Sequence, residues 1–142
     1  MQIPEPEAGL VISYSYLWRH EAEKGLDEGR KDRPCAVILA TQDNRVYVAP
    51  ITHSPPNDSE AIEIPMSIKK QIGLDDERSW LVTSEVNEFQ WPGLDLRPIS
   101  RRQPARSVYG KLPPNFTNQV KQEIQKHARA HTLKRVNRDD GG

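Results

Sequence analysis

Short apolar runs separated by turn residues fill the first half of the chain. Residues 9–18 (GLVISYSYLW) are rich in β-branched and aromatic side chains, which predicts a first strand. Residues 35–40 (CAVILA) are continuously apolar, as in a strand that is buried on both faces. A turn sequence at 43–45 and the apolar run 46–51 follow, so residues 35–51 predict a β-hairpin. The charged segment 20–32, which contains two glycines, predicts a loop.

Helical spacing appears at two places further along. Residues 65–72 begin with proline, have isoleucine at every fourth position from 64 to 72, and are followed by a glycine at the position of a C-cap. Residues 115–134 place apolar side chains from Phe116 to Ile124 on one face, which predicts a C-terminal helix.

The remaining segments predict shorter elements. We expect strands at 61–64, 79–85 and 108–109 and a turn-rich segment at 87–98, which contains two prolines and a glycine. The last six residues, 137–142, predict a disordered tail after a single domain of residues 1–136. These elements together indicate a mainly β (α+β) fold, a small barrel with a short mid-chain helix and a C-terminal helix.

Composition agrees with this fold class. A chain of 142 residues is the usual size of one domain, and 12 prolines with 8 glycines argue against a helical bundle. No apolar run approaches the ~20 residues of a membrane span, and the acidic N-terminus predicts no signal peptide. The single cysteine, Cys35, cannot form an internal disulfide, so we expect a reducing, cytoplasmic compartment and a buried, inert thiol.

Charge is distributed unevenly along the chain. Residues 1–100 hold 10 basic and 17 acidic side chains, whereas residues 101–142 hold 10 basic and 3 acidic ones, although the formal net charge is zero. The basic end fits either an anionic partner or a solvated helix that pairs with the acidic body.

Four segments, taken in order, carry a resemblance to a known family. They are KDRPCAVIL at 31–39, VYVAPITHS at 46–54, SWLVTSEVNEFQWPGLDLRP at 79–98 and YGKLPPNF at 109–116. Together they resemble the PemK/MazF toxins of bacterial toxin–antitoxin systems, over residues 9 to about 126. The resemblance implies an SH3-like barrel, a homodimer, and metal-independent cleavage of single-stranded RNA without a cofactor. It also implies a small antitoxin protein as partner.

The first candidate loop precedes the central hairpin. The family places a catalytic arginine immediately before its Arg-Pro-led strand, and Arg33 matches that position. A guanidinium offers a planar fork of donors that suits phosphate oxygens, so Arg33 would stabilise the transition state. Lys31 would be a phosphate contact in the RNA-binding set. The alternatives are an Arg33–carboxylate pair and a solvated lysine.

The second candidate loop follows the hairpin. The family carries a threonine or serine here, and Thr52 matches it as a group that would hydrogen-bond the scissile phosphate. Histidine is the side-chain type best suited to proton transfer near neutral pH, so His53 is a candidate general base, with an exposed loop histidine as the alternative. Ser54 is a candidate RNA contact, and the alternative for Thr52 is a hydroxyl that caps the strand end.

Three further candidates lie in the segment 79–98. Glu85 could act as a base or pair with Arg33 or Arg97, and Asn87 could orient RNA. Trp91 could stack on a base or pack over one end of the barrel. The chain shows no P-loop, dinucleotide-binding glycine motif or metal-ligand pattern with three clear ligands, so we expect no metal. A protein of this fold that binds DNA gyrase, or a silent binding module, remains the alternative to a nuclease.

Overall fold

Eight strands and three helices make up the computed structural model, which describes residues 3–26, 29 and 31–139. In chain order the elements are β1 (Leu10–Tyr14), α1 (Arg19–Glu23), β2 (Arg33–Ala40), β3 (Arg45–Thr52), β4 (Ala61–Glu63), α2 (Met66–Gln71), β5 (Trp80–Val82), β6 (Glu85–Gln90), β7 (Val108–Lys111), α3 (Pro114–Arg129) and β8 (Lys134–Asn137). No helix in the described ranges is both long and apolar enough to cross a membrane.

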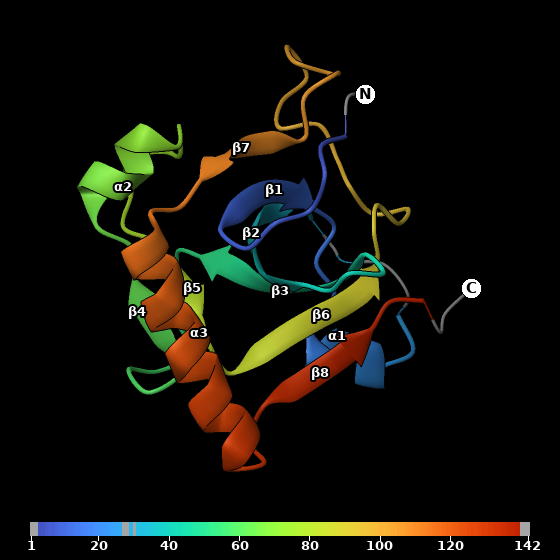
Figure 1. The fold of residues 1–142 in the computed structure, drawn as a ribbon, viewed down its shortest axis with the longest axis vertical. Coiled ribbons are helices and arrows are strands. Elements are labelled where there is room, and N and C mark those ends of the chain that lie inside the picture. Colours follow the sequence, from blue (N-terminus) through green and yellow to red (C-terminus); the bar gives the residue numbers. More distant parts are fainter. Residues whose placement is uncertain (1–2, 27–28, 30, 140–142) are drawn as a thin grey trace.

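The strands form one mainly antiparallel sheet. Its main path runs β4-β5-β3-β2-β1-β7, and β6 pairs with both β3 and β8. Figure 1 shows β6 and β8 side by side, and this pair is parallel. The expected mainly β class, mid-chain helix and C-terminal helix are therefore confirmed.

Side chains on the two faces of the sheet form two hydrophobic clusters. Ala36 and Ile38 of β2 belong to the first cluster, together with Ile72, the residue after α2, and Val120 of α3. Cys35 and Val37 belong to the second cluster, and Leu39 is exposed. The prediction of a strand buried on both faces is thus confirmed for its first four apolar residues, because successive side chains of a strand point to opposite faces.

Three predicted segments differ from the structure. Residues 19–23 form the short helix α1 where the charge pattern predicted a loop, because the Glu21 carboxylate caps the helix by accepting a hydrogen bond from Trp18 N at 3.0 Å. The expected strand 79–85 is divided between β5 and β6, and β6 extends into the segment predicted as turns. The C-terminal helix ends at Arg129, before His131 with its positive φ of 59°.

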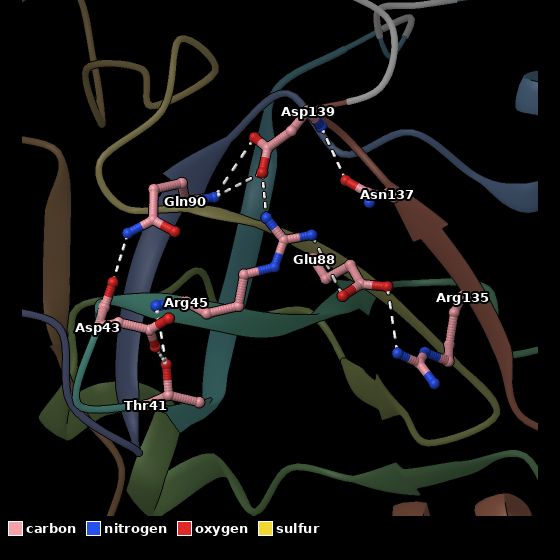
Figure 2. A network of polar contacts seen from close by, with 8 residues as sticks. All are labelled: Thr41, Asp43, Arg45, Glu88, Gln90, Arg135, Asn137 and Asp139. Atoms are coloured by element: carbon pink, nitrogen blue, oxygen red, sulfur yellow. Dashed lines mark hydrogen bonds and ion pairs between the residues drawn. The ribbon is translucent and has the colours of Figure 1, made fainter.

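The chain stays ordered beyond the predicted domain boundary at residue 136. Asn137 ends β8, and the Asp139 carboxylate binds both the Arg45 guanidinium and Gln90 N. Figure 2 shows this network, in which Glu88 also pairs with Arg45 and Arg135, each at 3.3 Å. These contacts attach the C-terminal segment to β3 and β6. The rest of the expected tail, residues 140–142, lies outside the described residues.

Candidate functional site

The β2–β3 hairpin brings the two main candidate residues to the same end of the sheet. Cys35 lies opposite Pro50 and Ala36 opposite Ala49, so continuing this register places Arg33, the first residue of β2, opposite Thr52, the last residue of β3. The two side chains nevertheless line separate pockets and make no hydrogen bond to each other within the described ranges.

Arg33 lies in a pocket of about 340 Å³, which we call the arginine pocket. It is lined by Tyr16, Trp18, His20, Glu21, Lys31 and Arg33. The guanidinium carbon of Arg33 lies 5.0 Å from the centre of the Trp18 ring, a cation–π distance. Trp18 also stacks on His20, with 6.3 Å between ring centres, and meets the edge of Tyr16 at 5.2 Å. The pocket therefore combines three basic side chains with aromatic walls.

The Nε atom of Arg33 is buried and has no hydrogen-bond partner among the described residues. A buried donor without an acceptor costs about 1–3 kcal/mol, and native structures keep few of them. The unpaired Nε belongs to a guanidinium whose residue lines the pocket, which makes Arg33 the candidate in this pocket for binding an acceptor group. The pocket holds two cations, Lys31 and Arg33, and one carboxylate, Glu21, whose Oε1 accepts a hydrogen bond from Trp18 N, so its charges favour an anion.

Glu85 and Asn87 bind residues that line or flank this pocket. Glu85 is 6% exposed, and its Oε1 accepts hydrogen bonds from Arg19 N at 2.7 Å and Tyr16 Oη at 3.3 Å. Burial raises the pKa of the Glu85 carboxyl above its usual value, although these two hydrogen bonds oppose the shift. These partners replace the pairs with Arg33 or Arg97 that the sequence left open.

Asn87 is fully buried and binds one residue of the chain twice. Its amide donates to Leu17 O at 2.8 Å, and its Oδ1 accepts from Leu17 N at 3.0 Å. Direct contact of Asn87 with RNA conflicts with this burial. The side chain instead fixes the segment that leads into Trp18.

A separate, smaller pocket of about 50 Å³ is lined in part by Thr52 and His53, and Ser54 follows them in the chain. The Thr52 hydroxyl accepts a hydrogen bond from Ser54 N at 3.1 Å, which is the strand-end cap considered above. His53 and Ser54 are exposed. His53 Nε2 lies 2.9 Å from Asp75 Oδ2, and its Nδ1 lies 3.5 Å from Glu77 Oε2.

The carboxylate partners of His53, and the buried lysine that binds one of them, were not predicted from the sequence. Lys69 is 1% exposed, and its ammonium donates to Asp75 Oδ1 at 2.7 Å, to Ser79 Oγ at 2.7 Å and to Glu77 O. Partial burial raises the pKa of Asp75, but the Lys69 hydrogen bond and the nearby His53 outweigh it, so this pKa is lowered overall. A lysine among the isoleucines of the predicted helix 65–72 was the one sign in the sequence of a buried charge. The sequence could not show that Asp75 is its partner.

His53, Asp75 and Glu77 also bear on metal binding. Their ligand atoms lie within 4.8 Å of one another, close enough to share a divalent cation. The Lys69 ammonium and the direct Asp75–His53 contact already satisfy the Asp75 carboxylate. All three residues are exposed, so the group does not form an enclosed site.

Trp91 lies in the second hydrophobic cluster. Trp91 is only 8% exposed, and its ring centre lies 6.2 Å from that of Phe89. Its indole N–H donates a hydrogen bond to Pro4 O at 3.0 Å. A ring buried in this way has no free face for a base to stack on. Trp91 therefore packs within the protein, as the alternative proposed, and in this conformation it does not stack on an RNA base.

Comparison with known proteins adds no relative to this description. The chain matches no protein-family model, and a search of curated proteins finds no significant match.

Proposed function

We propose that this protein is a metal-independent endoribonuclease that cleaves single-stranded RNA, with the arginine pocket as the site that binds the scissile phosphate. The observation that carries the proposal is the buried Nε of Arg33, which lacks an acceptor among the described residues, in a pocket shared with Lys31 and His20. A phosphate supplies acceptor oxygens and negative charge together.

The proposed reaction needs no bound nucleophile, because RNA carries its own. The 2′-oxygen forms a bond to phosphorus while the bond from phosphorus to the 5′-oxygen breaks. A base takes the 2′-hydroxyl proton, and the departing 5′-oxygen receives a proton, which leaves a 2′,3′-cyclic phosphate and a 5′-hydroxyl. Arg33 would donate to the nonbridging oxygens, whose charge grows in the transition state.

The other candidate residues would have different roles in this reaction. Thr52 lies across the hairpin end from Arg33, and its hydroxyl would leave the local Ser54 contact to bind the phosphate. His53 follows directly and is the exposed candidate for the base, and one of its ring nitrogens would leave its carboxylate partner, Asp75 or Glu77, to accept the proton. Glu85 is buried with its Oε1 occupied. We therefore propose Glu85 as a positioning residue rather than the base.

The biological setting is part of the same proposal and rests on the resemblance to PemK/MazF toxins. We propose an SH3-like barrel that acts as a homodimer, as the toxin of a toxin–antitoxin pair in the cytoplasm. The mainly antiparallel sheet with helices α2 and α3 packed on one cluster supports the barrel. The free, buried Cys35 is compatible with a reducing compartment.

The test is a cleavage assay on a long single-stranded RNA in the presence of EDTA, with the new 5′ ends mapped by sequencing. We expect discrete cuts that carry 5′-hydroxyl groups, and we expect Arg33→Ala to abolish them. Arg78→Ala is a matched control, because Arg78 also lies over a tryptophan, at 4.9 Å from the Trp80 ring, but its guanidinium is bound to Glu63.

Three results would contradict the proposal. Unchanged cleavage by Arg33→Ala would remove Arg33 from the site, and loss of cleavage in EDTA would exclude the metal-independent mechanism. A folded protein that makes no cuts over a range of salt and RNA would favour a binding function, and a gyrase supercoiling assay would then separate a gyrase ligand from a silent module.

A further inference from the structure

Residues 97–107 form a projecting loop that carries four arginines and no acidic residue, and we call it the arginine arm. Figure 1 shows it as the orange excursion that precedes β7. Ile99 N donates to Arg106 O at 2.8 Å, and Ser100 and Gln103 form an isolated bridge, so the two sides of the arm are joined by backbone contacts.

Both ends of the arm are attached beside the candidate active site. Arg97 N donates to Ser13 O at 2.9 Å, and Ser13 N donates to Ser107 O at 2.8 Å. The Ser13 hydroxyl also donates to Pro98 O at 3.2 Å. Since Ser13 lies opposite Pro34 in the β1–β2 pair, the arm starts and ends one strand away from the residue that follows Arg33.

The four arginines of the arm differ in how they are bound. Arg97 faces Asp32 and Asp95, each at 3.7 Å, and Arg106 donates to Val108 O and Tyr109 O, so both stabilise the base of the arm. Arg101 and Arg102 are exposed and make no ion pair or hydrogen bond within the described ranges. Arg101 and Arg102 therefore lie on a loop that is attached at both ends, and no acidic side chain of the described residues pairs with them.

A third pocket lies between the arm and Asp32. Its volume is about 350 Å³, and its lining includes Ser13, Asp32, Ser100, Arg101 and Tyr109. Asp32 separates Lys31 from Arg33 in the sequence, so this pocket and the arginine pocket lie on either side of one short segment. A polyanion bound at Arg33 could continue past Asp32 toward Arg101.

We propose that the arginine arm binds the backbone of the RNA outside the cleaved step, with Arg101 and Arg102 as phosphate contacts. This inference rests on the proposed function, since it extends the substrate path from the arginine pocket. Arginine contacts to phosphate supply affinity without reading sequence, so the arm would lengthen the bound RNA without setting the cleavage motif.

Binding of a 20-nucleotide, 2′-O-methylated RNA, which cannot be cleaved, tests the arm separately from catalysis. For single strands the logarithm of the binding constant falls with the logarithm of salt by about 0.7 for each phosphate contact. The double variant Arg101→Ala/Arg102→Ala should therefore lower the slope by about 1.4. Extrapolated from 1 M to 0.1 M salt, a slope change of about 1.4 corresponds to a Kd increased by about 25-fold.

The control removes the same charge from another surface. Lys126→Ala/Arg129→Ala changes two exposed basic residues of α3, and we expect it to leave the slope within about 0.3 of the starting protein. Circular dichroism and thermal melting check that both variants fold. In cleavage assays the arm variant should raise KM for a long RNA, keep its kcat, and cleave a trinucleotide that spans the scissile step at the original rate.

The possible outcomes separate the arm from the proposed function. If the unaltered protein binds RNA but the arm variant has the same salt slope, the arm inference is overturned while the nuclease proposal stands. If the arm variant loses binding to polyglutamate but not to RNA, the arm belongs to an acidic protein partner and the inference is overturned. If the unaltered protein neither binds nor cleaves RNA, the proposed function itself fails.

Discussion

Arg138 gives the sharpest test of how the C-terminal segment holds the fold and the site together. The residue follows β8, and its side chain is 3% exposed. Its Nη1 donates to Ser15 O at 2.7 Å and to Asn87 Oδ1 at 3.2 Å, and its Nη2 lies 3.0 Å from Asp95 Oδ2. We predict that Arg138→Ala destabilises the protein strongly, because it leaves the Asp95 carboxylate and two buried acceptors without this cation.

The size of the effect follows from these contacts. Removing one partner of a buried ion pair typically costs about 3–5 kcal/mol, a large share of the ~5–15 kcal/mol that stabilises most domains. Each kcal/mol shifts the melting midpoint of a chain of this size by roughly 3–4 °C, so we expect the midpoint to fall by about 10–20 °C. Urea unfolding followed by circular dichroism measures the free energy directly.

Arg135→Ala, three residues earlier in β8, is the matched control. Its side chain is 55% exposed, and it pairs with Glu88 at 3.3 Å, so its loss should cost less than about 1 kcal/mol. Equal destabilisation by the two variants would refute the reasoning, since burial and the number of buried acceptors are what distinguish them. A stable Arg138→Ala protein would likewise show that Asn87 positions Leu17 without help from Arg138.

Three further predictions concern the candidate site. Thr52→Ala should slow RNA cleavage at least tenfold, which is about 1.4 kcal/mol of barrier, and single-turnover kinetics would detect it; a normal rate would confine Thr52 to capping the strand end. His53→Ala should slow cleavage and change its dependence on pH near neutrality, and an unchanged rate and profile would assign the base elsewhere. Burial raises the folded-state pKa of Glu85, so the folded protein holds this proton more tightly than the unfolded chain does. The free energy of unfolding should then decline as pH rises from the unfolded-state pKa of Glu85 through its raised folded-state pKa. Glu85→Gln should remove this decline, which urea unfolding at pH 4 and pH 7 measures. Parallel pH profiles for the two proteins would contradict the assignment.

Local sequence patterns determined the elements whose stabilising contacts are close in the chain. The hairpin of β2 and β3 was predictable because an apolar run, a turn and a second apolar run follow one another. The helix α2 was predictable for the same reason, and Gly73 has the positive φ of 75° that suits a glycine after a helix. Since Arg33 and Thr52 lie at the ends of this hairpin, their common location also followed from the sequence.

Tertiary structure alone decided the elements whose partners are distant. The segment Lys134–Asn137 is polar, with Val136 as its buried residue, and it is a strand because it pairs with β6, about 50 positions earlier. The roles of Glu85 and Asn87 depend on Tyr16, Leu17 and Arg19, which meet them only in the fold. Sequence patterns report periodicity and local turn preference, whereas burial and hydrogen-bond partners across the sheet arise only when the strands assemble.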